Sequence, residues 1–291
     1  MKIAFTKMQG LGNDFMLIDC RQVRPDNLSD LSKRLCHRRF GIGADQILLL
    51  FDSACADFMM RIFNADGSEV EMCGNGIRCL AKYIWDRNLS DKKTLHIETL
   101  AGTIKPEKVD NMVKVDMGEP LFEPEKIPVR ISEELNPPSP HFTSASGGGE
   151  QGRIIDYPLK IEDREFKITF VSMGNPHAVI FVEDLSHFPV TYYGPMIETH
   201  PIFPKKTNVE FINVLNPSEI QMRVWERGSG ETMACGTGAS AAVVVSSIKG
   251  LTERNVTVRL LGGDLFIDWA GDNHVYMTGP AEEVFWGIVD I

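Results

Sequence analysis

The chain has 291 residues, of which 43% are apolar and 24% charged, and its formal net charge at pH 7 is −10. This length accommodates two domains with separate cores, and the composition is typical of globular proteins in water. The acidic balance and the lack of a Lys/Arg cluster argue against a nucleic-acid-binding surface. No apolar run approaches the roughly 20 residues that span a bilayer, and residues 1–7 lack a signal-peptide core. We therefore expect a cytoplasmic protein that binds neither nucleic acid nor membrane.

The first part of the chain predicts mainly strands. Alternation over 3–8 and an apolar run over 15–18 predict two strands joined by a turn at 10–14. Ser29-Asp30 is expected to cap a helix that runs through Leu35. The further strands expected here are 47–51, 58–63, a region near 94–105, and 112–117.

The first long helix is expected directly after Cys73. This cysteine precedes Gly-Asn-Gly, and Ile77, Leu80 and Ile84 then recur at spacings of three and four residues. A thiol at a helix N-terminus lies near unsatisfied N–H groups and the positive end of the helix dipole. Both features favour a thiolate, so Cys73 is a candidate reactive residue.

The second part repeats this arrangement. Cys235 precedes Gly-Thr-Gly and a uniformly apolar run that predicts a buried helix over 236–249. A short helix is expected near 194–199, and residues 136–152 have a low complexity typical of a mobile surface insertion. The strands expected here are 154–161, 165–173, 177–183, 208–215, 219–225, 255–261, 264–269, and a tail over 275–291 with a break at 278–280.

Four polar positions recur in the two parts at one offset, 235 − 73 = 162 residues. The pairs are Asn13 with Asn175, Gln46 with Asn208, Asn64 with Glu226, and Cys73 with Cys235. Such agreement predicts two copies of one α+β fold, each a mostly antiparallel sheet wrapped around one long helix. We expect the chemistry to lie where the copies face each other.

Two thiols of equivalent surroundings suit the inversion of a carbon that carries an acidic C–H. A thiolate on one face removes the proton while a thiol on the other face delivers one. The N–H groups of the two helix N-termini, at Gly74, Asn75, Gly236 and Thr237, are expected to bind an α-carboxylate and stabilise the developing charge. The sequence has no nucleotide-binding or pyridoxal-phosphate motif, which favours chemistry without a cofactor.

The motifs around these positions resemble those of diaminopimelate epimerases, in the order typical of that family and over essentially the whole chain. They are Gly12-Asn13-Asp14-Phe15, Gly43-Ala44-Asp45-Gln46, Phe63-Asn64-Ala65-Asp66-Gly67-Ser68, Cys73-Gly74-Asn75-Gly76-Ile77-Arg78, Gly174-Asn175-Pro176-His177, Thr207-Asn208-Val209-Glu210-Phe211, Trp225-Glu226-Arg227-Gly228, Ala234-Cys235-Gly236-Thr237-Gly238 and Met277-Thr278-Gly279-Pro280-Ala281. Residues 136–152 resemble the family least.

The resemblance implies an epimerase that interconverts LL- and meso-2,6-diaminoheptanedioate without a cofactor or metal, in the formation of lysine and cell-wall precursors. Cys73 and Cys235 would be the base and the acid. His177 and Glu226 would tune which thiol is ionised. The distal carboxylate would be held by Asn64, Asn175, Asn208 and Arg227, the distal ammonium by Glu226, and the pocket would be completed by Asn13 and Gln46.

The resemblance also implies an organisation in two pseudo-symmetric domains and a homodimer. The first domain would comprise residues 1–117 together with a returning C-terminal strand, 280–291. The second domain would comprise residues 118–279.

Simpler interpretations remain for several of these residues. Cys20, Cys36, Cys55 and Cys79 are expected to be small buried apolar residues, and the spacing of Cys73 and Cys79 is not that of a zinc site. Asn13 and Asn175 could be turn residues, His177 a structural histidine and Arg227 a surface charge. The repeat at 162 residues favours binding for the two asparagines.

Three rival functions also remain. A proline or hydroxyproline racemase would share the two cysteines, but the Arg and Asn clamp for a second carboxylate would be surplus. A PhzF-like isomerase would be expected to lack the cysteine pair. A thiol-redox or binding protein would form a regulatory disulfide and would not catalyse C–H exchange.

Overall fold

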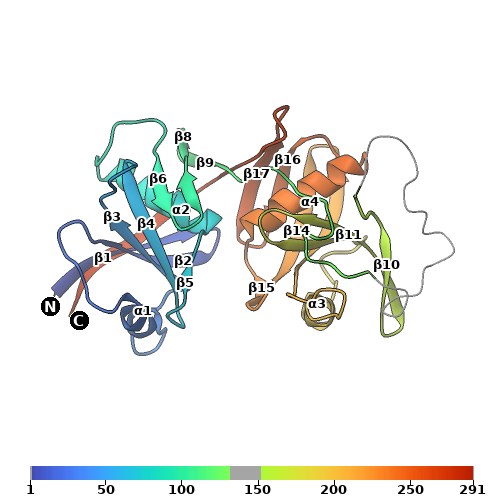
Figure 1. The fold of residues 1–291 in the computed structure, drawn as a ribbon, viewed down its shortest axis with the longest axis horizontal. Coiled ribbons are helices and arrows are strands. Elements are labelled where there is room, and N and C mark those ends of the chain that lie inside the picture. Colours follow the sequence, from blue (N-terminus) through green and yellow to red (C-terminus); the bar gives the residue numbers. More distant parts are fainter. Residues whose placement is uncertain (1, 132–151, 291) are drawn as a thin grey trace. The chain divides into compact units, whose positions relative to one another are not determined.

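The computed structural model describes residues 2–131 and 152–290 (Figure 1). The chain divides into two compact units. Lobe 1 comprises Met1–Asp116 together with Thr278–Ile291, and lobe 2 comprises Met117–Met277. The low-complexity insertion expected at 136–152 lies outside the described residues, apart from Gly152.

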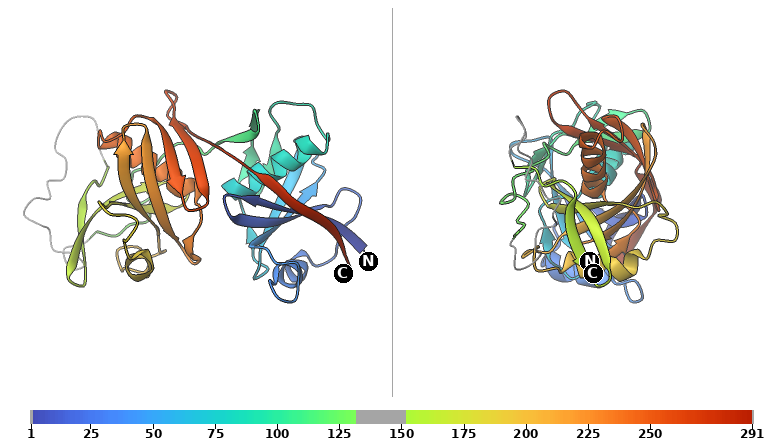
Figure 2. Two further views of the ribbon diagram at one scale, coloured as in Figure 1. Left: turned by 180° about the vertical axis from the view of Figure 1, so that it is seen from behind. Right: turned by 90° about the vertical axis from the view of Figure 1, so that its right-hand side faces the viewer.

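The sheet of lobe 1 contains both the first and the last strand of the described chain. Its strands are β1 (Lys2–Gly10), β2 (Asn13–Asp19), β3 (Gln46–Phe51), β4 (Phe58–Asn64), β5 (Glu69–Val70), β6 (Ile97–Thr99), β7 (Gly102–Ile104) and β19 (Glu282–Asp290). They follow the order β19-β1-β2-β3-β4-β6-β7, with β5 against β4. The pairs β2–β3 and β4–β6 are parallel, and the other pairs are antiparallel. Because β1 and β19 are antiparallel, the two termini lie side by side (Figure 2).

Two helices complete the described part of lobe 1. The central one, α2 (Gly74–Asp86), packs on β1, β2, β3 and β4 and buries Ile77, Leu80 and Ile84 completely. The shorter one, α1 (Leu28–Cys36), is capped by Asn27, whose side chain accepts a hydrogen bond from the N–H of Asp30. The cap expected at Ser29-Asp30 was therefore wrong, because Asn27 adopts a left-handed conformation that asparagine tolerates well.

A hairpin follows α2 and the strands β6 and β7 in the chain. It is formed by β8 (Glu107–Val109) and β9 (Met112–Asp116).

Lobe 2 has a second mixed sheet. Its strands are β10 (Tyr157–Ile161), β11 (Arg164–Ser172), β12 (Pro176–Phe181), β13 (Asn208–Asn216), β14 (Glu219–Glu226), β15 (Gly230–Thr232), β16 (Asn255–Leu260) and β17 (Gly263–Trp269). They follow the order β10-β11-β12-β13-β14-β16-β17, with β15 against β14. A further strand, β18 (Val275–Gly279), runs across the division between the lobes.

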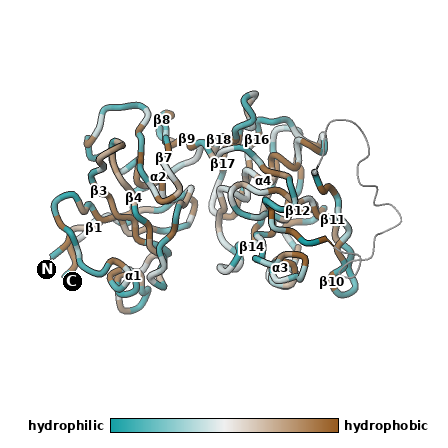
Figure 3. The backbone as a smooth tube through the Cα atoms, in the orientation of Figure 1, coloured by the Kyte–Doolittle hydropathy of each residue, from teal (hydrophilic) through white to brown (hydrophobic). Residues whose placement is uncertain are grey.

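The helices of lobe 2 are α3 (Val190–Glu198) and α4 (Gly236–Ile248). As expected, α4 is buried along most of its length, from Gly238 to Ser246. Helix α3 begins four residues before the position expected from the sequence. Pro195 lies inside the helix. Hydrophobic stretches coincide largely with the strands and helices, and the connections are more hydrophilic (Figure 3).

The internal repeat holds in three dimensions. Helices α1 and α3 differ by 162 residues at both ends, as do α2 and α4. The parallel strand pairs keep the same register, with Phe15 opposite Gln46 in lobe 1 and His177 opposite Asn208 in lobe 2. Even one ion pair recurs, from Arg61 to Glu69 and from Arg223 to Glu231. The expected α+β class, with two related lobes that each wrap a sheet around one helix, is confirmed.

Candidate active site

In lobe 1, the thiol of Cys73 lies at the start of the central helix. Cys73 is the N-cap of α2, with extended backbone angles, and its Sγ accepts a hydrogen bond from the N–H of Gly76 at 3.4 Å. The Sγ also lies 3.9 Å from Oδ1 of Asn13, which accepts a hydrogen bond from Nδ2 of Asn75 at 3.3 Å. The sulfur thus has both a donor and an acceptor within reach.

The first turn of α2 approaches the sheet closely. A Cβ atom at Gly76 would lie 3.0 Å from the Leu48 side chain and 3.5 Å from that of Phe15, and the side chain of Cys73 would be 3.4 Å away. A glycine is therefore required for the helix to begin against these two apolar side chains. This contact holds the backbone N–H groups of Gly74 and Asn75 at the helix N-terminus beside Cys73.

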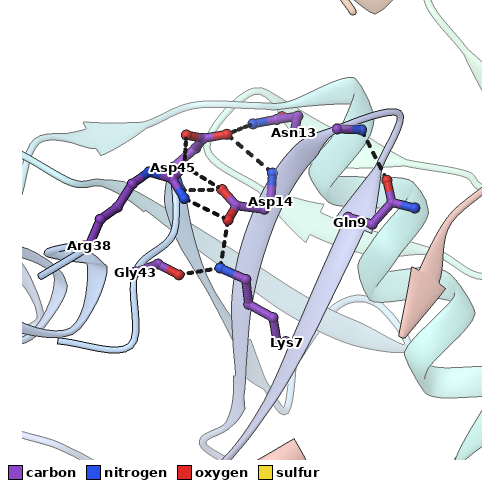
Figure 4. Close-up of polar contacts among 8 residues, drawn as sticks. Lys7, Gln9, Asn13, Asp14, Arg38, Gly43 and Asp45 are labelled. Carbon is purple, nitrogen blue, oxygen red and sulfur yellow. Dashed lines mark hydrogen bonds and ion pairs between the residues drawn. The ribbon is translucent and has the colours of Figure 1, made fainter. Parts of the chain in front are cut away.

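The amide of Asn13 is held from behind by a charged network (Figure 4). Its Nδ2 donates to Oδ2 of Asp45 at 2.8 Å, and the same oxygen accepts from the N–H of Asp14 at 3.1 Å. Arg38 bridges Asp14 and Asp45, and Lys7 donates to Asp14 at 2.7 Å. Because Asp45 accepts from the nitrogen end of the amide, the oxygen end of Asn13 faces Cys73 and Asn75.

The network also governs the charge of Asp14. Burial raises the pKa of its carboxyl, but hydrogen bonds and attraction from Arg38 and Lys7 lower that pKa well below its usual range. Asp14 therefore stays ionised at all physiological pH values, and the network keeps its geometry.

Gln46 and Asn64 form a separate pair in lobe 1. Nε2 of Gln46 donates to Oδ1 of Asn64 at 2.8 Å, and Nδ2 of Asn64 donates to Oγ of Ser68 at 2.9 Å. The two residues are cross-strand neighbours on β3 and β4. They lie in the same lobe as Cys73. They hydrogen-bond to each other, and Asn64 also hydrogen-bonds to Ser68.

In lobe 2, the thiol of Cys235 is more deeply buried than that of Cys73. Cys235 is the N-cap of α4, and its Sγ lies 3.5 Å from the hydroxyl of Thr237. Burial raises the pKa of this thiol well above its ordinary value, and the carboxylates of Glu226 and Glu210 raise it further. Hydrogen bonds from Thr237 and the N–H of Gly238 oppose that rise. The thiol form of Cys235 is therefore favoured at neutral pH.

Glu226 ends strand β14 beside this thiol. Burial raises the pKa of its carboxyl, while hydrogen bonds from Thr232 and Cys235 lower it. Glu210 raises the pKa of Glu226 and His177 lowers it, which shows that these groups act on one another. A carboxyl group and a thiol that influence each other in a buried site are suited to proton transfer.

His177 is completely buried between two oxygen atoms. Its Nδ1 lies 2.7 Å from Oε1 of Glu210, which is also completely buried, and its Nε2 lies 2.8 Å from Oδ1 of Asn175. Nδ2 of Asn175 in turn donates to Oγ1 of Thr237 at 3.3 Å. A continuous chain of contacts therefore runs from Glu210 through His177, Asn175 and Thr237 to Cys235.

Asn208 positions the loop that carries Arg227. Nδ2 of Asn208 donates to the carbonyl of Pro176 at 2.9 Å, and its Oδ1 accepts from the N–H of Arg227 at 2.9 Å. The guanidinium of Arg227 is exposed and reaches the carbonyl of Lys205 at 3.4 Å. Its remaining donors are available for a planar anion such as a carboxylate.

The residues expected from the sequence are divided between the two lobes. In lobe 1 they are Asn13, Gln46, Asn64, Cys73, Gly74 and Asn75, and in lobe 2 they are Asn175, His177, Asn208, Glu226, Arg227, Cys235, Gly236 and Thr237. Contacts lead from Cys73 to Asn13 and Asn75, and from Cys235 through Thr237 to Asn175 and His177, whereas Gln46 pairs with Asn64 and Asn208 with Arg227. Sequence reasoning assigned no role to Asp45 or Glu210. The sequence did contain a sign that Glu210 is unusual. The residue 162 positions earlier is the apolar Leu48, so the second copy of the repeat has a charged residue where the first has an apolar one.

Two further observations concern the described residues. Within residues 2–131 and 152–290, no group of three or more His, Cys, Asp or Glu side chains is arranged to hold a metal ion. In the same part of the chain, no helix has the length and apolar character needed to cross a membrane.

The fold is shared with several solved structures over essentially the whole chain. A PhzF-family phenazine biosynthesis protein from Bacillus anthracis matches with a TM-score of 0.71 at 17% identity, each chain being covered completely. A hydroxyproline epimerase from Agrobacterium vitis matches with a TM-score of 0.63 at 15% identity, covering 99% of this chain and 91% of its own. These likenesses define the fold class: the two-lobed fold that these proteins share.

Sequence similarity is far more specific. The family model for diaminopimelate epimerase matches residues 5–123 and 169–284. Relatives named diaminopimelate epimerase include one from Pelotomaculum thermopropionicum, 52% identical with 97% of each chain covered, and one from Acetivibrio thermocellus, 48% identical over 99% of this chain and 98% of its own. One from Methanococcus maripaludis is 48% identical over 99% of each chain. The chain belongs to the diaminopimelate epimerase family, which confirms the resemblance expected from the motifs.

Proposed function

We propose that this protein is a diaminopimelate epimerase, which interconverts LL- and meso-2,6-diaminoheptanedioate in the cytoplasm for lysine and cell-wall precursor synthesis. Family membership supports this activity, as do the names of relatives that are about half identical over nearly the full length. The observation that carries the chemistry is the equivalent placement of Cys73 and Cys235 as N-caps of the central helices.

The proposed reaction moves one proton on each face of the α-carbon. The thiolate of one cysteine takes the α-proton and becomes a thiol, and the electron pair of the broken C–H bond stays on the α-carbon and its carboxylate. The thiol of the other cysteine then delivers its proton to the opposite face and becomes a thiolate. No electrons leave the substrate, so the reaction needs no oxidant, and we assign both proton transfers to the two thiols without a cofactor.

Backbone N–H groups would stabilise the intermediate charge. Gly74 and Asn75 begin α2, and Gly236 and Thr237 begin α4, so their N–H groups lie at the positive ends of the two helices. A carboxylate placed against such groups gains charge stabilisation as the α-proton leaves. This electrostatic term accounts for proton abstraction from a weakly acidic carbon.

The polar side chains would recognise the distal amino-acid group. Asn64, Asn175, Asn208 and Arg227 are assigned to the carboxylate, Glu226 to the ammonium, and Asn13 and Gln46 to the remaining walls. The exposed guanidinium of Arg227 supports its role, because its forked donors match a carboxylate in geometry. An analogue without the distal carboxylate is therefore expected to bind poorly.

The two thiols are assigned different starting states. Burial and neighbouring carboxylates raise the pKa of Cys235, so this residue begins as the thiol and acts as the acid. Cys73 then begins as the thiolate and acts as the base. After one turnover the roles are reversed, and catalysis proceeds in the opposite direction. His177 and Glu226 tune this balance from beside Cys235.

Incubation of the enzyme with LL-diaminopimelate in D2O tests the proposal. We expect the meso isomer to appear with one deuterium at a single α-carbon, and added EDTA or pyridoxal phosphate to have no effect. Cys73→Ala and Cys235→Ala are each expected to lose epimerisation, since each removes one of two required groups. Full turnover by either variant would contradict the two-base scheme.

Oxidation provides a second test of the thiol pair. Mild oxidation is expected to join Cys73 to Cys235 and abolish activity, and reduction is expected to restore it. Peptide mapping of the oxidised protein identifies the linkage. A different pairing, or unchanged activity, would contradict the proposal and favour a redox or binding protein.

We further propose that the protein forms a homodimer through strand β19. This strand ends the sheet of lobe 1 in the described chain and exposes 69% of Trp286 and 64% of Ile288 to solvent. Val284 and Phe285 are also exposed. An apolar edge strand promotes association, and a second copy can bury the same patch on both partners.

Sedimentation velocity measures this association. Wild-type protein is expected to sediment as a dimer, and Trp286→Lys is expected to shift it to a monomer because the lysine charge opposes burial of the patch. Lys160→Ala, an exposed substitution in lobe 2, serves as the control. A monomeric wild-type protein at micromolar concentration would contradict the homodimer.

A further inference from the structure

The two lobes differ most at the pair of residues beneath the first turn of the central helix. In lobe 1 these residues are Phe15 and Leu48, and at the positions 162 residues later lobe 2 has His177 and Glu210. Like Leu48 beneath Gly76, Glu210 lies directly beneath the equivalent glycine, with Oε1 2.8 Å from a Cβ atom built on Gly238. An apolar contact in one lobe is thus replaced by a buried charged contact in the other.

This replacement is costly, which indicates a role other than packing. Both His177 and Glu210 have no exposed side-chain surface, and Oε2 of Glu210 accepts no hydrogen bond within the described residues. Removing charges from water is expensive, and apolar side chains of similar volume are often at least as stabilising. Phe15 and Leu48 show that this fold accommodates such side chains at these positions.

The side chains that hold Asn13 and Asn175 differ between the lobes. As a result, the amide groups of these two equivalent asparagines point in opposite directions. In lobe 1, Asp45 can only accept a hydrogen bond, so it holds the nitrogen end of Asn13 and leaves the oxygen facing Cys73. In lobe 2, His177 lies between Glu210 and Oδ1 of Asn175. A carboxylate at Nδ1 and an amide oxygen at Nε2 are both acceptors, an arrangement that matches a ring with a donor at each nitrogen. The nitrogen end of Asn175 is therefore turned toward Thr237.

We propose that Asp45 and Glu210 are positioning residues that lock the amides of Asn13 and Asn175 in opposite orientations, and thereby favour opposite protonation states of the two thiols. Asp45 acts directly on Asn13. Glu210 acts through His177, whose doubly protonated ring it balances. Neither residue touches the sulfur or the reacting carbon.

Each orientation stabilises a different state of its sulfur. The oxygen of Asn13 accepts a hydrogen bond and so favours the S–H form of Cys73. Thr237 accepts from Asn175, which leaves its own hydrogen free to be donated to the thiolate of Cys235. In the proposed reaction Cys73 begins as the base and Cys235 as the acid. After the proton transfers Cys73 is a thiol and Cys235 is a thiolate, and these are the two states that the asparagine orientations favour. The consequence for turnover rests on the proposed function, whereas the effect on the two thiols does not.

Glu210→Gln tests the lobe 2 lock with little change of shape. A neutral amide no longer balances a charged ring, so His177 becomes neutral, its Nε2 accepts, and Asn175 turns its oxygen toward Thr237. The hydroxyl hydrogen of Thr237 is then used by Asn175 and no longer by the thiolate. The His177–Glu210 pair is neutral in total before and after the change, so the net charge of the pair is conserved.

The readout is the pH dependence of alkylation at each cysteine, followed by peptide mass spectrometry. Only the thiolate reacts, and the midpoint of the profile is independent of access to the site. The groups that face Cys235 and contribute to this profile are Glu226, Glu210 and His177. Glu210→Gln is expected to raise the Cys235 midpoint by about one pH unit, the effect of one charge-assisted hydrogen bond. The Cys73 midpoint is expected to stay unchanged.

Two further variants keep this test decisive. The double variant His177→Phe with Glu210→Leu gives lobe 2 the residue types of lobe 1, and we expect it to fold and to raise the Cys235 midpoint as well. Glu198→Gln removes another buried carboxylate of lobe 2, one that pairs with Trp225 and Gly228, and it should leave the midpoint unchanged. A Cys235 midpoint that stays constant or falls in Glu210→Gln would overturn the lobe 2 assignment.

The lobe 1 lock is tested in the same way. Asp45→Ala frees Asn13 to turn its nitrogen toward Cys73, so the Cys73 midpoint is expected to fall by about one pH unit. Asp45→Asn keeps an accepting oxygen and is expected to restore the wild-type midpoint. If Asp45→Ala leaves Cys73 unchanged, or Asp45→Asn behaves like it, the lobe 1 assignment is wrong.

A direct observation of His177 separates this inference from the proposed function. Nitrogen-15 NMR of the wild-type protein is expected to show both ring nitrogens of His177 protonated at neutral pH, and only one protonated in Glu210→Gln. A singly protonated ring in the wild type would overturn the inference even if epimerisation is observed. Absence of epimerisation with a doubly protonated ring would contradict the function alone.

Discussion

At the scale of single residues, the surroundings of each thiol decide its chemistry. Cys73 and Cys235 lie at helix N-termini, whereas Cys20 and Cys79 have no exposed surface. Cys55 is exposed, so the expectation that it is buried was wrong. Burial raises the pKa of Cys20 to about 12, with a smaller effect from Asp19, and burial also raises the pKa of Cys79 to about 12. Residues of one type therefore serve as apolar packing at two positions and as acid–base candidates at two others.

The buried thiols predict how stability depends on pH. Because the native pKa of Cys20 and Cys79 lies above the ordinary value of 9.0, the folded state keeps a proton that the unfolded state releases. Their contribution to the free energy of unfolding is fully present below pH 9 and is lost between pH 9 and 12. Urea unfolding across this range measures the slope. A variant with Cys20→Ala and Cys79→Ala should show a shallower slope than wild type, and an equal slope would contradict the assignment.

Residue-scale prediction from the sequence succeeded where a pattern identified a backbone position. The repeated Cys-Gly-polar-Gly located both thiols at helix N-termini, because the apolar period of the following helix is visible in one sequence. Asp45 and Glu210 received no role, because each makes its contact with a residue from a distant segment of the chain. Glu210 contacts His177 across the parallel pair β13–β12, a pairing that periodicity does not reveal.

At the scale of elements, a small residue lets helix α3 pack on the sheet of lobe 2. A Cβ atom at Gly194 would lie 2.6–2.8 Å from the inner atoms of the Trp225 side chain. Trp225 precedes Glu226, and its Nε1 donates to Glu198 at the end of α3 at 2.7 Å. The helix and the strand that carries Glu226 are thus held in one arrangement by a glycine and a tryptophan.

Gly194→Ala is expected to destabilise lobe 2 by about 1–3 kcal/mol, because the Trp225 ring base cannot move without shifting β14. Chemical denaturation measures the change in the free energy of unfolding. Gly271→Ala is the matched control, since a Cβ atom there would meet nothing within 4 Å. Equal stability of the two variants would show that α3 adjusts freely.

The sequence predicted the long elements better than the short ones. Helices α2 and α4 were located from apolar spacing and from the glycines that begin them. The single region expected near 94–105 is two short strands, β6 and β7, joined by a tight turn at 100–101. Three-residue strands are stabilised by their neighbours in the sheet more than by local propensity, so their limits depend on contacts distant in sequence.

At the scale of the whole molecule, lobe 1 is built from two distant parts of the chain. Strand β19 pairs with β1 along almost its whole length, from Lys2 opposite Asp290 to Gln9 opposite Glu282. Phe5 and Phe285 pack edge to face across this pair, with ring centroids 5.9 Å apart. Lobe 2 is a single continuous segment and has its own core, which includes Phe170, Phe211 and Ile180.

Removal of residues 282–291 is expected to unfold lobe 1 and to leave lobe 2 folded. Without β19, the buried side chains of β1 lose their cover and its hydrogen-bonding edge is exposed. Hydrogen exchange with mass spectrometry should show lost protection in β1 to β4 and retained protection in β11 to β14. Trp286→Lys, which keeps the strand, should retain protection in both lobes. Equal loss in both lobes after truncation would contradict their independence.

The returning strand also sets an order of events during protein synthesis. Translation delivers the residues of lobe 2 without interruption, so this segment can fold as soon as it leaves the ribosome. The N-terminal residues emerge first, yet their sheet is incomplete until β19 has been made. A nascent chain therefore carries an unfinished first half throughout most of its elongation, and this half is the part that a chaperone would need to shield.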